Sequence, residues 1–318
     1  MSEVGQAPAA VIMVRPHHFV PNPATISDNL FQARSEVPPS RALADAALAE
    51  VTAVADALRG VGVGVHLFDD ESTGTPDSVF PNNWFSTHPD GRVAIYPLYA
   101  PNRRAERRAD IVQSLRVGFQ VNGVHDYSVL EDDCLYLEGT GSMVLDHVGR
   151  VAYVARSFRS HDRAVAMVCR DLGYEPVVFS SLDSRGAPIY HTNVMMSVGS
   201  TVALVALDSF EHRAERDAVE RRLAASGRAV VPLTQGQVDE FAGNAIELRG
   251  TGGSYLLLSA RAYDSLTSEQ RATLSAHVHL LPVAVPTIEL AGGSVRCMVA
   301  GIHLPRRVRE TGLAEVGG

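Results

Sequence analysis

Glu138-Gly-Thr-Gly-Ser-Met-Val-Leu-Asp146 is followed, after a short loop, by Arg150-Val-Ala-Tyr-Val-Ala155. Short apolar runs on either side of a tight loop predict two neighbouring strands. Residues 160–172 come next and carry apolar side chains at helical spacing, which predicts an amphipathic helix. The stretch therefore predicts a unit of two or three strands and one helix, which is too small to bury its own apolar face.

Similar units recur along the chain. They occupy residues 82–115, 138–172, 191–225 and 247–277, and residues 290–303 begin a fifth. Four points taken as equivalent are spaced by 55, 55 and 54 residues (138 − 83, 193 − 138, 247 − 193): Asn83, Glu138, Asn193 and Glu247. A fixed period of this kind is typical of proteins built from repeated units.

Five such units closed in a ring would bury one another's apolar faces. Only a short tail follows residues 290–303, so residues 11–68 are expected to complete the fifth unit. Within them, residues 40–59 have a helical pattern with Ser40 as the N-cap. We therefore predict one α/β domain over residues 1–318, with a flexible tail at 306–318.

The composition is that of an ordinary globular protein, with 46% hydrophobic and 20% charged residues. The net charge of -8 disfavours a nucleic-acid-binding protein, because such a protein needs a basic face. The one basic cluster, residues 103–108, contains an acid and is interpreted as the solvated side of a helix. With neither a signal-peptide pattern nor an apolar run of roughly 20 residues, we expect a cytoplasmic protein without a membrane partner.

Three cysteines in 318 residues do not suggest a disulfide framework, which favours a reducing compartment. Cys169 lies on the apolar stripe of a predicted helix and Cys134 precedes a predicted strand, so both are interpreted as packing residues. No motif or ligand cluster indicates a metal site, and no cofactor is expected. Cys297 differs because it follows a glycine pair and precedes an apolar run, where a loop enters a strand.

Cys297 is a candidate nucleophile. A free cysteine is more commonly a small buried hydrophobe, so the candidate needs a base and a carboxylate from elsewhere in the chain. In a ring of repeated units, equivalent points converge on the central axis. The starts of the predicted inner hairpins carry polar side chains, namely Asp77, Asn83, Glu138, His191 and Asn193. A thiol, an imidazole and a carboxylate are therefore expected to meet at the axis.

These residues resemble the motifs of the guanidino-group-modifying, or pentein, superfamily, which includes arginine deiminases, dimethylarginine hydrolases and amidinotransferases. The strings that carry the resemblance are Asp77-Ser-Val-Phe80-Pro-Asn-Asn83, Leu137-Glu138-Gly139, His191-Thr-Asn193 and Cys297. Residues 82–88, 137–143 and 191–196 look like the arginine-deiminase-related branch called citrulline-utilisation hydrolases. The resemblance covers nearly the whole chain and implies a five-bladed pseudo-symmetric α/β propeller.

The resemblance also implies a mechanism without a metal or cofactor. Cys297 would attack the planar carbon of a guanidino or ureido group and form a covalent intermediate. His191 would protonate the departing nitrogen and then deprotonate water. Glu138 would hold His191 or the substrate nitrogens. Asp77 would accept hydrogen bonds from substrate N–H groups, with Phe80 of the same motif among the substrate-binding residues.

Asn83 and Asn193 stand where the arginine enzymes of the superfamily carry two acids. A buried guanidinium needs anionic partners, whereas a carboxamide complements both the N–H donors and the carbonyl of a neutral ureido group. Citrulline, hydrolysed to ornithine, ammonia and carbon dioxide, is therefore the expected substrate. Glu138 and Asp77 could still hold a guanidinium, so an arginine or dimethylarginine hydrolase, a deiminase and an amidinotransferase stay open as alternatives.

The residues that bind the amino-acid end of the substrate are less clearly marked. Arg15, Arg249 and Arg296 each lie near a strand end or a glycine loop, although exposed structural arginines are the common case. A non-catalytic binding protein on the same propeller is the alternative from another class, but it would not need Cys, His and Glu on one axis. The expected partner is a small amino acid, and the sequence is compatible with a homo-oligomer.

Overall fold

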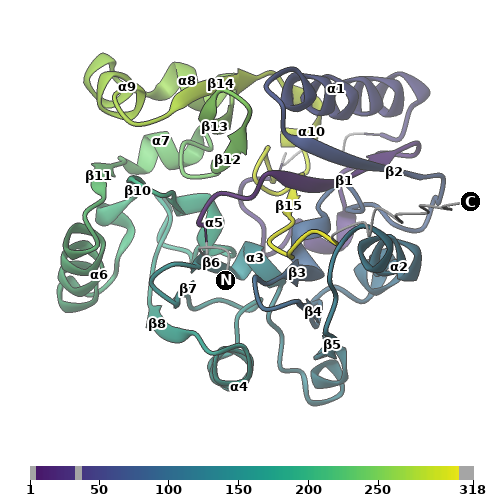
Figure 1. The fold of residues 1–318 in the computed structure, drawn as a ribbon, viewed down its shortest axis with the longest axis horizontal. Coiled ribbons are helices and arrows are strands. Elements are labelled where there is room, and N and C mark those ends of the chain that lie inside the picture. The colour runs from purple at the N-terminus through teal and green to yellow at the C-terminus, as the bar shows by residue number, and fades with distance from the viewer. Residues whose placement is uncertain (1–4, 33–37, 308–318) are drawn as a thin grey trace, which may run out of the picture.

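Five three-stranded sheets surround a central axis in the computed structural model of the chain (Figure 1). The structure describes residues 5–32 and 38–307. The longer helices lie at the periphery and the strands lie closer to the centre (Figure 1). This arrangement confirms the predicted five-bladed α/β propeller. Of the tail predicted at residues 306–318, residues 308–318 lie outside the described part of the chain.

All five sheets share one design. A short inner strand pairs antiparallel with the middle strand, which pairs parallel with the outer strand. In the order inner, middle and outer, the strands are β3 (Phe85–Thr87), β4 (Arg92–Ile95) and β5 (Gly123–Asp126); β6 (Met143–Asp146), β7 (Val151–Ala155) and β8 (Glu175–Phe179); β9 (Met196–Val198), β10 (Val202–Val205) and β11 (Ala229–Pro232); β12 (Ile246–Gly250), β13 (Gly253–Ser259) and β14 (His279–Val283); and β15 (Ala300–Gly301), β1 (Ala10–Pro16) and β2 (Gly64–Asp70).

Helices supply the crossovers that parallel strands require. They join the middle to the outer strands and are α1 (Arg41–Gly60), α2 (Ala109–Gly118), α4 (Asp162–Leu172), α6 (Arg213–Ala225), α8 (Ala260–Ser265) and α9 (Ser268–Ser275). The shorter helices are α3 (Gly139–Ser142), α5 (Thr192–Met195), α7 (Gln235–Asp239) and α10 (Pro286–Glu289). The 3-10 turns are η1 (Pro23–Thr25), η2 (Pro81–Asn83), η3 (Pro101–Glu106), η4 (Ser128–Asp133) and η5 (Leu207–Ser209).

The fifth blade joins the two ends of the described chain. β15 pairs antiparallel with β1, and β1 pairs parallel with β2 across α1. Ser40 caps α1 by accepting a hydrogen bond from the Leu43 N–H. Val54 and Leu58 of α1 are fully buried in one core cluster with Val11 of β1. Burial of each such side chain contributes about 1.5–3 kcal/mol, so the N-terminal segment closes the ring through a hydrophobic core.

The constant step of 55 residues predicted the number of blades but not their register. The turns η2, α3 and α5 enter the inner strands β3, β6 and β9, and their N-cap residues are Phe80, Glu138 and His191. The true steps are therefore 58 and 53 residues (138 − 80, 191 − 138). Glu247 is not equivalent to these residues, because it lies inside β12, where its Oε2 accepts a hydrogen bond from the Ser200 N–H at 2.5 Å.

Two surface assignments were wrong. Arg103 was placed on a solvated helix face, but its side chain is only 1% exposed and it belongs to η3, which precedes α2. Cys134 was interpreted as a packing residue, but it is exposed and has a left-handed φ of 55°. Cys169 is buried as expected, and burial raises the pKa of its thiol to about 12. Within residues 5–32 and 38–307, no helix is both long and apolar enough to cross a membrane.

Candidate active site

Cys297 lies in a tight turn that leads into β15, as predicted from the glycine pair before it. Its backbone N–H donates to the Ser294 carbonyl at 2.9 Å, which fixes the turn. The side chain is buried, with the residue only 2% exposed. Asn193 Nδ2 and Asn244 Nδ2 donate to the sulfur at 3.4 and 3.3 Å. The sulfur is therefore the hydrogen-bond acceptor of two side-chain amides.

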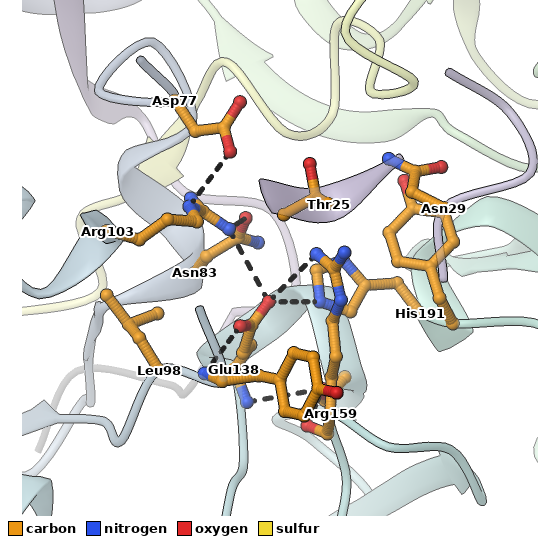
Figure 2. A network of polar contacts seen from close by, with 12 residues as sticks. Thr25, Asn29, Asp77, Asn83, Leu98, Arg103, Glu138, Arg159 and His191 are labelled. Carbon is orange, nitrogen blue, oxygen red and sulfur yellow. Dashed lines mark hydrogen bonds and ion pairs between the residues drawn. The ribbon is translucent and has the colours of Figure 1, made fainter. Parts of the chain in front are cut away.

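His191 and Glu138 occupy matching places in neighbouring blades, each directly before the turn that enters an inner strand. His191 Nε2 lies 2.8 Å from Glu138 Oε2 (Figure 2). Burial lowers the pKa of His191 to about 4 even though Glu138 opposes the shift. His191 is therefore neutral at pH 7 and can accept a proton.

Glu138 is fully buried, and burial alone would raise its pKa. Arg159, His191 and Arg103 overcome this effect and hold the pKa of Glu138 well below its usual range. Its Oε2 pairs with Arg159 Nη1 at 3.3 Å and with Arg103 Nη1 at 3.4 Å (Figure 2). Its Oε1 accepts a hydrogen bond from the Tyr99 N–H at 2.9 Å. Glu138 is therefore a carboxylate at the centre of a buried ion network.

Arg103 joins Glu138 to the Asp77 motif. Its Nε lies 3.2 Å from Asp77 Oδ2, and its Nη1 donates to Asn83 Oδ1 at 3.1 Å (Figure 2). Its Nη2 pairs with Glu106 at 2.9 Å. Burial would lower the pKa of Arg103, but these carboxylates raise it above its ordinary value, so the guanidinium stays charged.

Arg159 joins the network from the next blade. Its Nε donates to Asp28 Oδ2 at 2.7 Å, and its guanidinium lies over the Tyr190 ring at 4.8 Å. Among the described residues, its Nη2 has no hydrogen-bond partner although it is buried. Asp28 Oδ1 is likewise buried without a partner in this part of the chain. One donor and one acceptor of this ion pair therefore have no partner among the described residues.

These side chains surround one small pocket. The lining residues are Thr25, Asn29, Asp77, Phe80, Asn83, Arg103, Arg159, Tyr190, His191, Ala291, Gly293 and Cys297. Thr25 and Asn29 come from the segment after β1, and Asn29 Nδ2 donates to the Ala291 carbonyl at 3.2 Å. The N-terminal segment therefore covers the pocket from which Cys297 and His191 can be reached.

The structure brings together most of the predicted site residues. Cys297, His191, Asp77, Phe80 and Asn83 line the pocket, Glu138 bonds to His191, and Asn193 bonds to the sulfur of Cys297.

The three arginines proposed for the amino-acid end of the substrate do not reach this pocket. Arg249 is exposed and lines a separate surface depression. Arg296 lines a different cavity and donates to the Val299 carbonyl. Arg15 pairs with Asp69. Neighbours in sequence point to opposite sides of a turn, so proximity to Cys297 along the chain was misleading for Arg296.

Sequence reasoning missed Arg103, Arg159 and Asn244. Arg103 was missed because it belongs to the basic cluster at residues 103–108, which was interpreted as solvent-exposed. Arg159 follows a strand and is not part of any motif. Asn244 lies in the loop before β12, in Phe241-Ala-Gly-Asn244. An asparagine after a glycine next to an inner strand is a signal that could have identified it. In the described ranges, no group of three or more His, Cys, Asp or Glu side chains is arranged to hold a metal ion.

Residues 15–304 match the family model described as N,N dimethylarginine dimethylhydrolase, eukaryotic. This match spans most of the 318 residues. A search of curated proteins finds no match.

Solved structures of similar fold include ArgZ, described as an arginine dihydrolase from the ornithine-ammonia cycle in Cyanobacteria. The apo form has a TM-score of 0.71 at 17% identity, over 93% of this chain but only 41% of that chain. The N-terminal domain of ArgZ, bound to substrate, has a TM-score of 0.70 at 17% identity, over 93% of this chain and 98% of that domain. The chain thus spans about two fifths of full-length ArgZ.

A third match is a dimethylarginine dimethylhydrolase from Pseudomonas aeruginosa, a cysteine-to-serine mutant in complex with citrulline. It has a TM-score of 0.63 at 16% identity, over 93% of this chain and 100% of that chain. At such identities the likeness establishes the shared pentein propeller fold.

Proposed function

The chain belongs to the eukaryotic N,N-dimethylarginine dimethylhydrolase family, whose members are hydrolases of non-peptide carbon–nitrogen bonds, and from that premise we propose that it hydrolyses the ureido group of citrulline. The products are ornithine, ammonia and carbon dioxide. The observation that carries the choice of a neutral ureido group is that Asp77 and Glu138 are already paired with the buried arginines Arg103 and Arg159.

The first half of the reaction forms a bond between Cys297 Sγ and the ureido carbon. Neutral His191 takes the thiol proton, and the bond from that carbon to the terminal nitrogen breaks as His191 returns the proton to it. Ammonia leaves, and the carbamoyl group stays on the sulfur. Glu138 stabilises the imidazolium that exists between these proton transfers.

The second half hydrolyses the thiocarbamate. His191 takes a proton from water, the resulting hydroxide attacks the carbonyl carbon, and the carbon–sulfur bond breaks. Cys297 recovers its proton, and the released N-carbamate loses carbon dioxide to give ornithine. The atoms balance with one citrulline and one water.

Electrostatics favour a neutral reacting group over a cation. A buried guanidinium is stable only with anionic partners, and unpaired burial costs several kcal/mol. Asn83 lines the pocket and Asn193 contacts the sulfur, so both positions carry carboxamides instead of carboxylates. Asn193 Oδ1 is buried without a partner in the described chain, so it is available to accept an N–H from the ureido group.

The amino-acid end has a complementary place beside Arg159. The free Nη2 of Arg159 suits the α-carboxylate, and the free Oδ1 of Asp28 suits the α-ammonium group. Bound in this way, the substrate would satisfy two buried atoms that lack partners without it. Arg159 lines the same pocket as Cys297, so the side chain that carries the ureido group would extend from Arg159 toward the sulfur.

Arginine or dimethylarginine is the second candidate substrate. The family description names dimethylarginine, and ArgZ is described as an arginine dihydrolase. Glu138 lies close enough to the axis to attract a guanidinium if the substrate displaces an arginine contact. An amidinotransferase would pass the same intermediate to a second amine in place of water.

The test is to measure ornithine, citrulline and ammonia released from citrulline, arginine and dimethylarginine in parallel. We expect ornithine from citrulline at the highest kcat/KM, and no turnover by Cys297→Ser. The matched control is Cys169→Ser, which removes a buried thiol away from the pocket and keeps activity. Citrulline formed from arginine or dimethylarginine, without ornithine from citrulline, would replace the proposal with the second candidate.

A further inference from the structure

Asn244 reaches the nucleophile from a neighbouring blade. It lies between α7 and β12, in a loop that packs directly on the backbone of α5. A Cβ at Gly243 would lie 2.4 Å from the Val194 carbonyl oxygen, so only glycine allows this approach. The approach places the Asn244 side chain, which is fully buried, next to Cys297.

The hydrogen-bond partners of the Asn244 carboxamide determine how the amide is oriented. The Arg296 N–H donates to Oδ1 at 3.0 Å, and Nδ2 donates to the Asn193 carbonyl at 3.2 Å and to Cys297 Sγ at 3.3 Å. A backbone N–H can only donate and a carbonyl can only accept. Turning the amide over would therefore create two repulsive contacts, and this fixes the N–H that faces the sulfur.

Asn193 differs in this respect. Its Nδ2 also donates to the sulfur, at 3.4 Å, but its Oδ1 has no partner within the described residues. Nothing in its surroundings fixes the amide orientation, so Asn193 is free to turn toward a substrate. Asn244 has no such freedom.

We propose that Asn244 is a catalytic residue that stabilises the negative charge on Cys297 Sγ, formed when His191 takes the thiol proton, through a permanently oriented N–H donor. The assignment rests on the proposed function, in which this sulfur attacks the substrate. Hydrogen bonds to charged groups are stronger than those to neutral groups, so the donor favours the thiolate over the thiol. The Arg296 N–H contact also ties the donor to the backbone of the turn that carries the sulfur, so the two cannot separate.

Two substitutions distinguish the hydrogen bond from Asn244 to the sulfur from the packing of the Asn244 side chain. Asn244→Asp keeps the size of the side chain and the acceptor for the Arg296 N–H, but it turns a carboxylate oxygen toward the sulfur. Asn244→Ala removes the donor without adding a charge. The aspartate also faces the Asn193 carbonyl with an oxygen, so the two variants are compared as folded proteins. If Asn244 stabilises negative charge on the sulfur, folded Asn244→Asp is alkylated more slowly than folded Asn244→Ala, whereas a purely structural role does not slow alkylation of the folded Asp variant below that of the Ala variant.

The experiment is the rate of iodoacetamide alkylation of Cys297 as a function of pH, in the full chain without substrate. Trypsin cleaves after Arg296, so the extent is read by mass spectrometry on the peptide 297–306. We expect alkylation at pH 7 to slow by about tenfold in Asn244→Ala and more in Asn244→Asp, with both profiles moved to higher pH. Gln237→Ala, which removes another buried carboxamide from α7, keeps the wild-type profile.

Thermal unfolding of each variant checks that it is folded, and Asn244→Ser serves as a further variant if Asn244→Ala does not fold. A wild-type profile in folded Asn244→Asp, or an Ala variant slower than Asp, overturns the proposal. Because alkylation needs no substrate, the result is independent of citrulline turnover. Failure of the proposed function and failure of the Asn244 assignment are therefore distinguishable.

Discussion

His191 Nε2 lies 2.8 Å from Glu138 Oε2, with both side chains at most 2% exposed. Glu138→Gln removes the charge that stabilises the imidazolium, so we expect kcat to fall by about 100-fold or more. The change also leaves Arg103 and Arg159 short of a counter-charge, so the free energy of unfolding should fall by about 3–5 kcal/mol. Steady-state kinetics on the folded fraction and urea unfolding measure the two effects. A stable variant with wild-type kcat would remove Glu138 from the mechanism.

The pH dependence of activity follows from the state of His191. Burial lowers its pKa to about 4, so the imidazole is neutral and able to accept a proton at all pH values well above 4. We expect log kcat/KM to stay level on the acid side down to about pH 5 and to fall as pH approaches 4. The measurement is kcat/KM from pH 4 to 8 on enzyme shown to be folded. A fall centred near pH 6.5 would mean that His191 titrates as an exposed histidine does.

A second group of histidines affects stability. His88 and His147 are buried, His303 is half-buried with its ring 3.7 Å from the ring of His147, and His147 Nδ1 lies 2.8 Å from the Tyr174 hydroxyl. Burial lowers the pKa of His88 to about 3 and those of His147 and His303 well below the usual value of 6.5.

Because these pKa values are depressed, the unfolded chain binds more protons below pH 6.5. Stability is therefore complete above pH 6.5 and falls as pH decreases toward the folded pKa values. We expect urea unfolding at pH 5 to give a clearly smaller free energy than at pH 7, and His147→Asn to reduce the difference by about 1–2 kcal/mol. Equal stability of the wild-type protein at both pH values would contradict this account.

The sequence predicted the blades better than the ion network. Alternating apolar runs and helical segments report local structure, so five units and the closure by residues 11–68 could be inferred directly. Cys297, His191 and Glu138 were found because turns before inner strands converge on the axis. Arg103 and Arg159 could not be found in this way, because a buried arginine is recognised only by the carboxylates that fold around it. Arg296 is an error of the opposite kind. Its position directly before Cys297 in the sequence suggested that it binds the substrate, but its side chain lines a different cavity.

The proposed role of Arg159 in binding the α-carboxylate predicts that its replacement weakens binding only of substrates that carry this group. Arg159→Lys keeps a positive charge but cannot contact Asp28, Glu138 and a carboxylate with the geometry of a guanidinium. We expect KM for citrulline to rise by about tenfold or more. The comparison substrate is N-propylurea, which carries the ureido group but no amino-acid end, and its slow hydrolysis should be little affected. Equal losses on both substrates would indicate that Arg159 only supports the fold.

Gly141 lies where two site residues meet. A Cβ at this position would be 2.5 Å from Asn83 Nδ2 and 2.7 Å from His191 Cε1, closer than van der Waals contact allows. In Gly141→Ala the imidazole must therefore move, which disturbs its 2.8 Å contact with Glu138. Because the ring and the amide are side-chain ends, they can yield without unfolding the blade. We expect kcat to fall by about tenfold or more while the melting temperature changes by only a few degrees.

The matched control is Gly118→Ala at the end of α2, where a Cβ meets no atom within 4 Å among the described residues. That variant should keep wild-type kcat and be equally or slightly more stable, because alanine reduces the freedom of the unfolded chain. Wild-type activity in Gly141→Ala would show that the histidine position tolerates displacement, and the contact between His191 and Glu138 would then not limit the reaction. Loss of folding in Gly141→Ala alone would instead show that the turn before β6 is too rigid to yield, which would assign this glycine to the fold.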